Sequence, residues 1–167
     1  MGRTVYKDNW LTVEKVGFKI NGKKVEYTKT TEADVAVVVP ILWDGKLLLE
    51  KQFRHIINKD LIEFPAGHVE KGENPLKAAR RELEEETGMK AGKMKLMFEE
   101  YSNPGMAKRR FYYFLATGLK DGNMQWDETE KIGFLKLAPQ TVEKMIKSGE
   151  IEDHKTISAY LYYKLLK

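Results

Sequence analysis

The chain has 167 residues, of which 42% are hydrophobic and 32% are charged, a balance that suits one folded domain with a sizeable core. The absence of cysteine excludes disulfides, thiol catalysis and thiolate metal sites, and the three scattered histidines lack the spacing of a zinc site. The net charge of +4 fits a nucleic acid or an anionic phosphate substrate, and Lys108, Arg109 and Arg110 form the one basic cluster. No apolar run is long enough for a membrane span and the N-terminus has no apolar signal core, so we expect a cytoplasmic location.

The first predicted element is a β-hairpin. Residues 10–20 have the pattern of a strand, and Asn21 with Gly22 is a strong signal for a two-residue turn into a second strand at residues 24–28. Because an isolated hairpin is only marginally stable, we expect it to dock either on the chain's own core or on a partner subunit.

A buried strand is predicted next. Residues 35–42 form a nearly continuous β-branched run, which is typical of a strand covered on both faces. Asp44 and Gly45 then turn the chain into a strand at residues 46–53.

A helix is predicted over residues 75–87. Asn74 suits the N-cap, Pro75 suits the first helical position, and Gly88 suits the left-handed residue that ends a helix. Further strands are predicted at residues 94–101, 109–117 and 132–137, and helices at 139–148 and 154–166. Asp153 can cap the last helix, whose apolar face would comprise Ile157, Ala159, Tyr160, Tyr163, Leu165 and Leu166.

Three carboxylates share one face at the end of the helix at residues 75–87. Glu82, Glu85 and Glu86 are spaced i, i+3, i+4, so they repel one another, and each anion near a helix C-terminus costs about 0.3–1 kcal/mol. A bound cation would remove both penalties; the alternative is a solvated acidic helix end with basic counter-charges. Arg81 lies four residues before Glu85 and within loop reach of Glu73, so it could brace the loop against the helix.

These acidic residues are part of a longer motif. Residues 67–89 read GHVEKGENPLKAARRELEEETGM, and this stretch resembles the Nudix box of the Nudix hydrolases at every fixed position. The resemblance implies an α/β (α+β) fold, the Nudix α/β/α sandwich around a mixed central sheet. It also implies hydrolysis of a nucleoside diphosphate linked to another moiety.

The resemblance implies a role for each residue of the box. Glu82 and Glu86 would be the principal metal ligands, and the main-chain carbonyl of Ala66 would add another. Glu85 would be a shared or second ligand and would belong to the catalytic set. All of these are hard oxygen donors, which suit Mg²⁺ and allow Mn²⁺ as a substitute. Structural roles are implied for Gly67, Glu73, Arg81 and Gly88.

The general base is expected outside the box. In related pyrophosphatases it is a Glu on a late loop, a place occupied here by residues 125–130. Glu128 is the first choice and Glu130 the second, and the alternative is an ordinary solvated acidic loop.

Four segments resemble the ADP-ribose pyrophosphatase subgroup: residues 51–54, residues 63–67, Pro104 at 15 positions after Met89, and residues 149–153. Arg54 would then contact a phosphate through its planar fork of donors, unless it is a surface arginine at a strand end. Arg109 stands where the subgroup usually has Glu, which would favour a more negatively charged substrate or mark an interface. Substrate-binding roles are implied for Arg54, Glu63, Pro104, Gly105 and Arg109.

The same resemblance predicts the organisation of the chain. An N-terminal hairpin extension (residues 1–33) would precede a Nudix hydrolase domain (residues 34–167). In this subgroup the extension pairs across a dimer and helps to build the substrate pocket, so a homodimer is expected. Candidates for stacking on adenine, with core packing as the alternative, are Tyr6, Trp10, Phe18 and Tyr27.

The expected activity is Mg²⁺-dependent hydrolysis of ADP-ribose, or of a related nucleoside diphosphate sugar, to a nucleoside monophosphate and a sugar phosphate. Another diphosphate, such as a dinucleoside polyphosphate or NADH, is the alternative substrate. A binding module for nucleotides or RNA that does not cleave them is less favoured, because such modules usually lack a box carboxylate and this chain has all of them. The expected partner is therefore a nucleoside diphosphate-linked small molecule, with no membrane and no nucleic acid.

Overall fold

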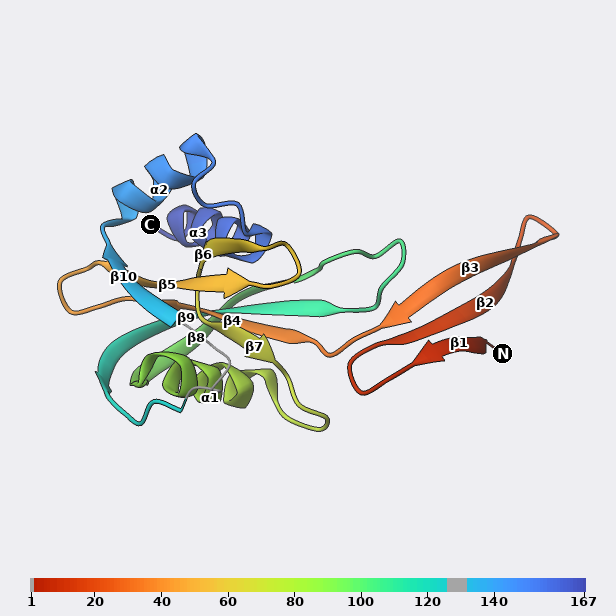
Figure 1. Cartoon of the computed structure of the whole chain (residues 1–167), viewed down its shortest axis with the longest axis horizontal. Coiled ribbons are helices and arrows are strands. Elements are labelled where there is room, and N and C mark those ends of the chain that lie inside the picture. Colours follow the sequence, from red (N-terminus) through yellow and green to blue (C-terminus); the bar gives the residue numbers. More distant parts are fainter. Residues whose placement is uncertain (1, 126–131) are drawn as a thin grey trace.

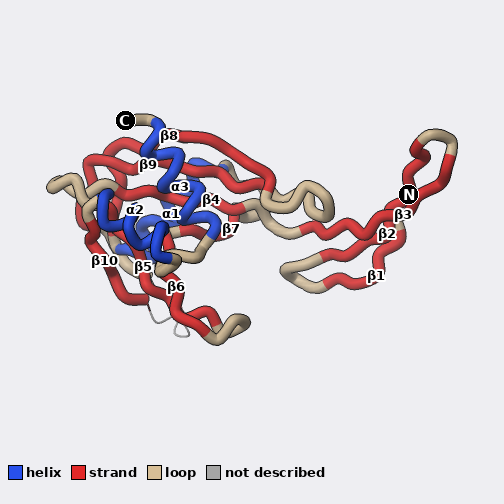
Figure 2. Tube along the Cα trace, turned by 90° about the horizontal axis from the view of Figure 1, so that it is seen from above, coloured by secondary structure: helices blue, strands red, loops and turns tan. Residues whose placement is uncertain are grey.

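The computed structural model describes residues 2–125 and 132–167. Within these ranges two sheets and three helices form a body, and a third sheet, at the N-terminus, projects from it (Figures 1 and 2). In chain order the elements are β1 (Arg3–Lys7), β2 (Thr12–Ile20), β3 (Lys23–Thr31), β4 (Val35–Pro40), β5 (Leu47–Arg54), β6 (Lys59–Glu63), β7 (Ala66–His68), α1 (Pro75–Thr87), β8 (Met89–Tyr101), β9 (Arg110–Asp121), β10 (Ile132–Leu137), α2 (Pro139–Ser148) and α3 (His154–Leu165).

The central sheet has four strands in the order β7-β4-β9-β8 and is mixed, because β4 runs parallel to β9 and the other pairs are antiparallel. All six residues of β4 are buried, which confirms the predicted buried strand, although the strand ends at Pro40 and not at residue 42. On one face Ala36 and Val38 pack with Leu83 of α1, and on the other face Val37 packs with Tyr160 of α3. The helices therefore cover both faces of the sheet, and the predicted fold class is confirmed.

A second sheet, β10-β5-β6, lies beside the central one and is antiparallel throughout. Its strand β5 contributes Leu47 and Leu49 to the same core as β4 and α3. β6 ends at Glu63, and the chain passes through Phe64 and Pro65 directly into β7. Because β5 and β6 are antiparallel, Glu63 at the end of β6 pairs with Glu50 in β5. The side chain of Arg54, at the end of β5, nevertheless hydrogen-bonds to Glu63.

The N-terminal extension is a three-stranded sheet, β1-β2-β3, and not the predicted two-stranded hairpin. Its central turn is as expected, since Asn21 and Gly22 both have positive φ, 49° and 81°, as a type I′ hairpin turn requires. β1 has no periodic pattern by which to recognise it, because all five of its residues are exposed. The extension reaches away from the body (Figure 1).

Helix α1 begins and ends where the sequence indicates. The Asn74 side chain accepts a hydrogen bond from the Leu76 N–H, and Gly88 takes the left-handed conformation with φ 68°. Asp153 caps α3 in the same way, by accepting from the Thr156 N–H. The predicted apolar face of α3 extends too far, because Leu165 and Leu166 are exposed; they lie at the helix end, beyond the sheet.

Among the described residues, no helix is both long enough and apolar enough to cross a membrane.

Candidate active site

A cavity of about 590 Å³ opens where the end of α1 meets the ends of β5 and β7. Its acidic wall carries Glu82 and Glu86 of α1, and its basic wall carries Arg54 of β5 and Lys155 of α3. Arg109 and Trp10 also line it, and Trp10 comes from the N-terminal extension. The fold thus brings together carboxylates and cations that are far apart in the chain.

Gly67 lies directly against the Glu82 carboxylate. A Cβ atom at residue 67 would stand 2.0 Å from the Glu82 carboxyl carbon, so any side chain there would displace that carboxylate. Burial raises the pKa of Glu82, although the neighbouring Arg81 opposes this rise. The absence of a side chain at Gly67 therefore gives Glu82 its place under the loop, beside the cavity.

Arg81 joins the loop to the acidic face of α1. Its Nε and Nη2 donate to the two carboxylate oxygens of Glu73, at 3.2 and 3.1 Å, and Nη2 also donates to the His68 carbonyl at 2.9 Å. Nη1 donates to Glu82 Oε1 at 2.7 Å and to Glu85 Oε2 at 3.0 Å. The pKa of Arg81 is raised, chiefly by Glu73, so this side chain stays a fixed cation among the three carboxylates.

Glu86 is tied to the loop as well, since its Oε2 accepts a hydrogen bond from the Ala66 N–H at 2.9 Å. The box therefore offers carboxylate oxygens from one helix face next to the main chain of Ala66, a set of hard donors that fits a divalent cation of the Mg²⁺ type. The missing side chain of Gly67 leaves room for the Glu82 carboxylate at this place, which adds to that fit. In residues 2–125 and 132–167, however, no three acidic or histidine side chains already converge on one point as a complete metal site.

Arg54 is held by Glu63, from the adjacent strand. Its Nε and Nη2 donate to the two Glu63 oxygens at 2.7 and 2.6 Å, and the Glu63 side chain is only 2% exposed. The hydrogen bonds to Glu63 raise the pKa of Arg54 above its already high ordinary value, so the guanidinium is always charged. Glu63 thus faces Arg54.

Arg109 stands at the mouth of the cavity. Its Nη1 donates to Glu32 Oε2 at 2.7 Å, its Nε donates to the Ala33 carbonyl at 2.9 Å, and its Nη2 lies 3.1 Å from His68 Nε2. Burial, followed by the charge of Arg109, lowers the pKa of His68, which favours the neutral ring. The Trp10 ring is tilted by 40° against that ring, with centroids 5.9 Å apart.

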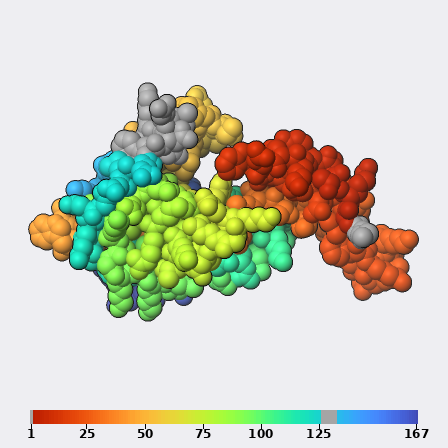
Figure 3. Space-filling model, turned by 90° about the horizontal axis from the view of Figure 1, so that it is seen from below, coloured from red at the N-terminus to blue at the C-terminus, as the bar shows by residue number. Residues whose placement is uncertain are grey.

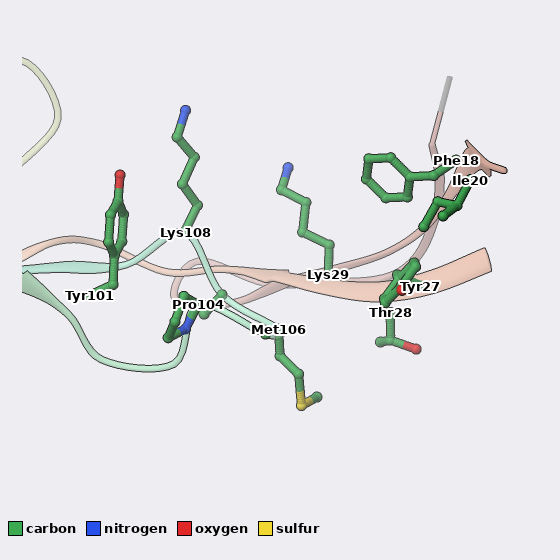
Figure 4. A pocket seen from close by; sticks show the side chains of 11 residues that line it. Phe18, Ile20, Tyr27, Thr28, Lys29, Tyr101, Pro104, Met106 and Lys108 are labelled. Carbon is green, nitrogen blue, oxygen red and sulfur yellow. The ribbon is translucent and has the colours of Figure 1, made fainter. Parts of the chain in front are cut away.

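Pro104 and Gly105 lie elsewhere, in a second hollow of about 580 Å³ between the extension and the β8–β9 loop. Figure 4 shows this hollow, where Tyr101, Lys108 and Lys29 point to one side of the ribbon and Met106 points to the other. Phe18 and Tyr27 line it and contact each other edge to face. The structure therefore does not bring the predicted Pro104 and Gly105 to the acidic cavity within one chain.

Glu128 and Glu130, the two candidates for the general base, lie outside the described residues. Conversely, the sequence reasoning missed Lys155 and His68 as cavity residues. Only the capping position of Asp153, two residues before Lys155, was a signal that the start of α3 has a defined structure. Nothing in the local sequence of His68 distinguishes it from an ordinary loop residue.

The comparisons with known proteins agree on one family. The model of the NUDIX domain matches residues 32–160. The ADP-ribose pyrophosphatase of Bacillus subtilis (strain 168) is 34% identical over 147 residues, which cover 87% of this chain and 80% of that protein. A protein of Bacillus methanolicus named methanol dehydrogenase activator is 32% identical over the same shares of the two chains.

The fold is also found among solved structures. One described as the crystal structure of an ADP compounds hydrolase superposes with a TM-score of 0.89, covering 99% of this chain and 91% of that chain. The identity is only 22%, so this likeness concerns the fold, including the N-terminal extension that such coverage takes in.

Proposed function

This chain belongs to the Nudix family, and on that premise we propose that it hydrolyses ADP-ribose or a related nucleoside diphosphate sugar. Water would attack the diphosphate, and the products would be a nucleoside monophosphate and a sugar phosphate. The observation that carries this proposal is the cavity that Glu82 and Glu86 line together with Arg54 and Lys155. The name of the B. subtilis relative supports the choice of substrate.

Nudix hydrolases generally depend on a divalent metal ion, and we propose Mg²⁺ here, with Mn²⁺ as a substitute. Glu82, Glu85, Glu86 and the carbonyl of Ala66 would hold it. Glu82, Glu86 and Ala66 line the cavity, and Glu85 shares Arg81 Nη1 with Glu82, so all four can provide hard oxygens. When bound, the ion supplies neutralisation of the diphosphate oxygens and activation of water. Gly67, Glu73, Arg81 and Gly88 would act structurally, by holding the loop and the end of α1 together.

The cationic residues would bind the diphosphate itself. Arg54 keeps its Nη1 outside the pair with Glu63, so this nitrogen can donate to a phosphate oxygen. Arg109 adds a positive charge at the cavity mouth, and a substrate with more negative charge would gain from it. The exposed indole of Trp10 would stack on the nucleobase, since it lines the same cavity.

The proton of the attacking water needs a base, and we keep Glu128 as the first proposal and Glu130 as the second. Replacing each by Gln separates them, because loss of the base lowers turnover by roughly 10²–10⁴-fold and leaves substrate binding nearly unchanged.

We also propose a homodimer formed through the N-terminal extension. Its sheet leaves several large apolar side chains exposed, among them Phe18, Ile20 and Tyr27, and these border the hollow that contains Pro104 and Gly105. A second copy that covers this hollow would bury the exposed rings and bring Pro104 and Gly105 into an interface between subunits. Their proposed part in substrate binding depends on that arrangement.

The decisive experiment is a hydrolysis panel with Mg²⁺, read by product mass. It should contain ADP-ribose, a GDP-linked sugar, NADH, a dinucleoside polyphosphate and a short RNA. The proposal predicts cleavage of a nucleoside diphosphate sugar into a monophosphate and a sugar phosphate. It also predicts that Glu86→Gln loses at least about 100-fold in activity, because loss of a mere outer-shell partner of a metal site already costs about 10–100-fold. Cleavage of NADH or the polyphosphate alone would favour that alternative, and RNA binding without products would favour a binding module.

A further inference from the structure

One buried carboxylate holds two cations on the basic wall of the cavity. The Glu63 side chain accepts both donors of the Arg54 fork, and its Oε2 also accepts a hydrogen bond from Lys155 Nζ at 3.1 Å. Glu63 is 2% exposed and Lys155 is 15% exposed. A desolvated carboxylate of this kind is stabilised only when its oxygens are fully paired, so Lys155 and Arg54 are linked through it.

Lys155 is in turn fixed by the first turn of α3. Its Nζ donates to Asp153 Oδ1 at 2.6 Å. The other oxygen of Asp153 accepts from the N–H and the hydroxyl of Thr156, at 2.9 and 2.8 Å. The same hydroxyl oxygen accepts from the Phe64 N–H at 2.9 Å, which joins α3 to the residue that follows Glu63. Lys155 therefore has little freedom to move relative to Glu63.

The charges of this network balance, since Arg54 and Lys155 are cations and Glu63 and Asp153 are anions. Among the interactions of the described residues, loss of Lys155 would remove one of the hydrogen bonds to Glu63 Oε2 and the ion pair of Asp153. The orientation of the Glu63 carboxylate would then be less constrained, and so would that of the Arg54 guanidinium plane, because the two are joined by a pair of parallel hydrogen bonds.

We propose that Lys155 is a positioning residue: through Glu63 it fixes the orientation in which Arg54 meets the substrate diphosphate. The inference rests on the proposed function of the cavity and deepens it. Arg54 binds the anion, Lys155 acts through Arg54, and Asp153 keeps Lys155 in place. The alternative, that Lys155 contacts the substrate directly and independently of Arg54, gives a different result in the test below.

The test is a double-mutant cycle of Lys155→Met and Arg54→Ala, assayed on the preferred substrate of the panel. Lys155→Met should raise KM roughly 10- to 100-fold, as removal of a supporting hydrogen-bond partner does elsewhere, and should change kcat much less. In the Arg54→Ala background the same substitution should change KM less than about twofold, since coupled residues are not additive. An undiminished effect in that background would overturn the proposal.

Two further variants separate positioning from general damage. Lys155→Arg keeps the charge and should restore most of the affinity. Lys164→Met is the matched control, because Lys164 lies on the same helix and pairs only with Glu143 among its described ion pairs; it should leave KM unchanged. Equal KM values in Lys155→Met, Lys155→Arg and wild type would reject the role.

A measurement without substrate keeps this inference distinct from the proposed function. The Nε–H group of Arg54 donates to Glu63, so it should give a sharp, shifted signal in a ¹H–¹⁵N spectrum, identified by its loss in Arg54→Lys. In Lys155→Met this signal should move and broaden, while in Lys164→Met it should not. An unchanged signal would refute the positioning role even if the enzyme is active, and a changed signal would support it even if the substrate panel fails.

Discussion

Gly67 shows how one position can decide the geometry of the acidic wall. Its missing side chain lets the loop lie on Glu82, whose carboxyl carbon is 2.0 Å from the place of a Cβ atom. Arg81 also joins the loop to the helix, because it donates hydrogen bonds to Glu73 and to Glu82. The loop, the arginine and the carboxylate therefore form one unit, in which a small shift of any member moves the others.

Replacing Gly67 by alanine should abolish most of the activity and leave the fold intact. The new methyl group must displace the Glu82 carboxylate, which is the flexible end of a side chain, so the main chain need not move. A displacement of about 1 Å in a site of this kind can cost about 100-fold in kcat/KM. Thermal melts and kinetics should be compared with Gly17→Ala, where a methyl group meets nothing within 4 Å; equal kinetics in the two variants would contradict the role given to Gly67.

Asp153 should make the stability of the protein sensitive to acid. Burial alone would raise its pKa, but the Lys155 ion pair and the Thr156 hydrogen bonds outweigh burial and lower the pKa below the ordinary 3.8. The folded state thus binds this proton more weakly than the unfolded state. The stabilisation is complete above pH 3.8 and is lost as the pH falls through the lower folded-state value.

Asp153→Asn should accordingly be less stable than wild type at neutral pH, and the gap should narrow in acid. Urea unfolding followed by circular dichroism measures the free energy of unfolding of the wild type and of Asp153→Asn, at neutral pH and at steps below pH 3.8. If the free energy of unfolding changed with pH in the same way for both proteins, Asp153 would not be the group that makes the stability sensitive to acid.

Helix α1 is the element that carries the acidic face, and its two caps determine where that face ends. Asn74 satisfies the Leu76 N–H at the start, and Gly88 allows the left-handed turn at the end. The helix is thereby prevented from extending past Thr87, which keeps Glu82 and Glu86 in its last turns, beside Gly67 and Ala66 respectively.

Removal of the N-terminal cap should lower the stability of the whole chain. Asn74→Ala leaves the Leu76 N–H without its acceptor and should cost about 1 kcal/mol in the free energy of unfolding. Asn74→Asp is the control, because its carboxylate can accept the same hydrogen bond and should keep the stability. A loss of similar size in both variants would mean that the cap is not the cause.

At the level of the entire molecule, the extension is the unusual feature. In the space-filling view of Figure 3 the N-terminal residues form a lobe that stands away from most of the body. Phe18, Ile20 and Tyr27 are all more than 40% exposed on it. An apolar surface of this kind on a projecting sheet is typical of a protein–protein interface.

Substitution of the exposed rings should therefore dissociate the proposed dimer. In sedimentation velocity the wild type should have twice the 19.4 kDa mass of the chain, and the double variant Phe18→Ser, Tyr27→Ser should have the mass of one chain. Trp43→Ser, at a turn residue that is 98% exposed, should remain dimeric. A monomeric wild type at the concentrations of the activity assay would contradict the proposal.

The sequence alone was sufficient for α1, its caps and the shared face of Glu82, Glu85 and Glu86, because helix periodicity and capping are properties of neighbouring residues. It was also sufficient for the buried strand β4 and for the fold class. It did not predict β1, whose residues are all exposed and carry no periodic pattern. It also did not predict the contact between Glu63 and Lys155 in the site.

Only the tertiary structure decided which residues meet across the cavity. Lys155 and Glu63 are 92 positions apart, and no local pattern records that their side chains share a buried contact. In the same way, Gly67 could be recognised from the motif, but the carboxylate that requires its missing side chain appears only once the loop lies on α1. Local periodicity fixes which face of an element is polar, whereas the packing of distant elements fixes which charges that face encounters.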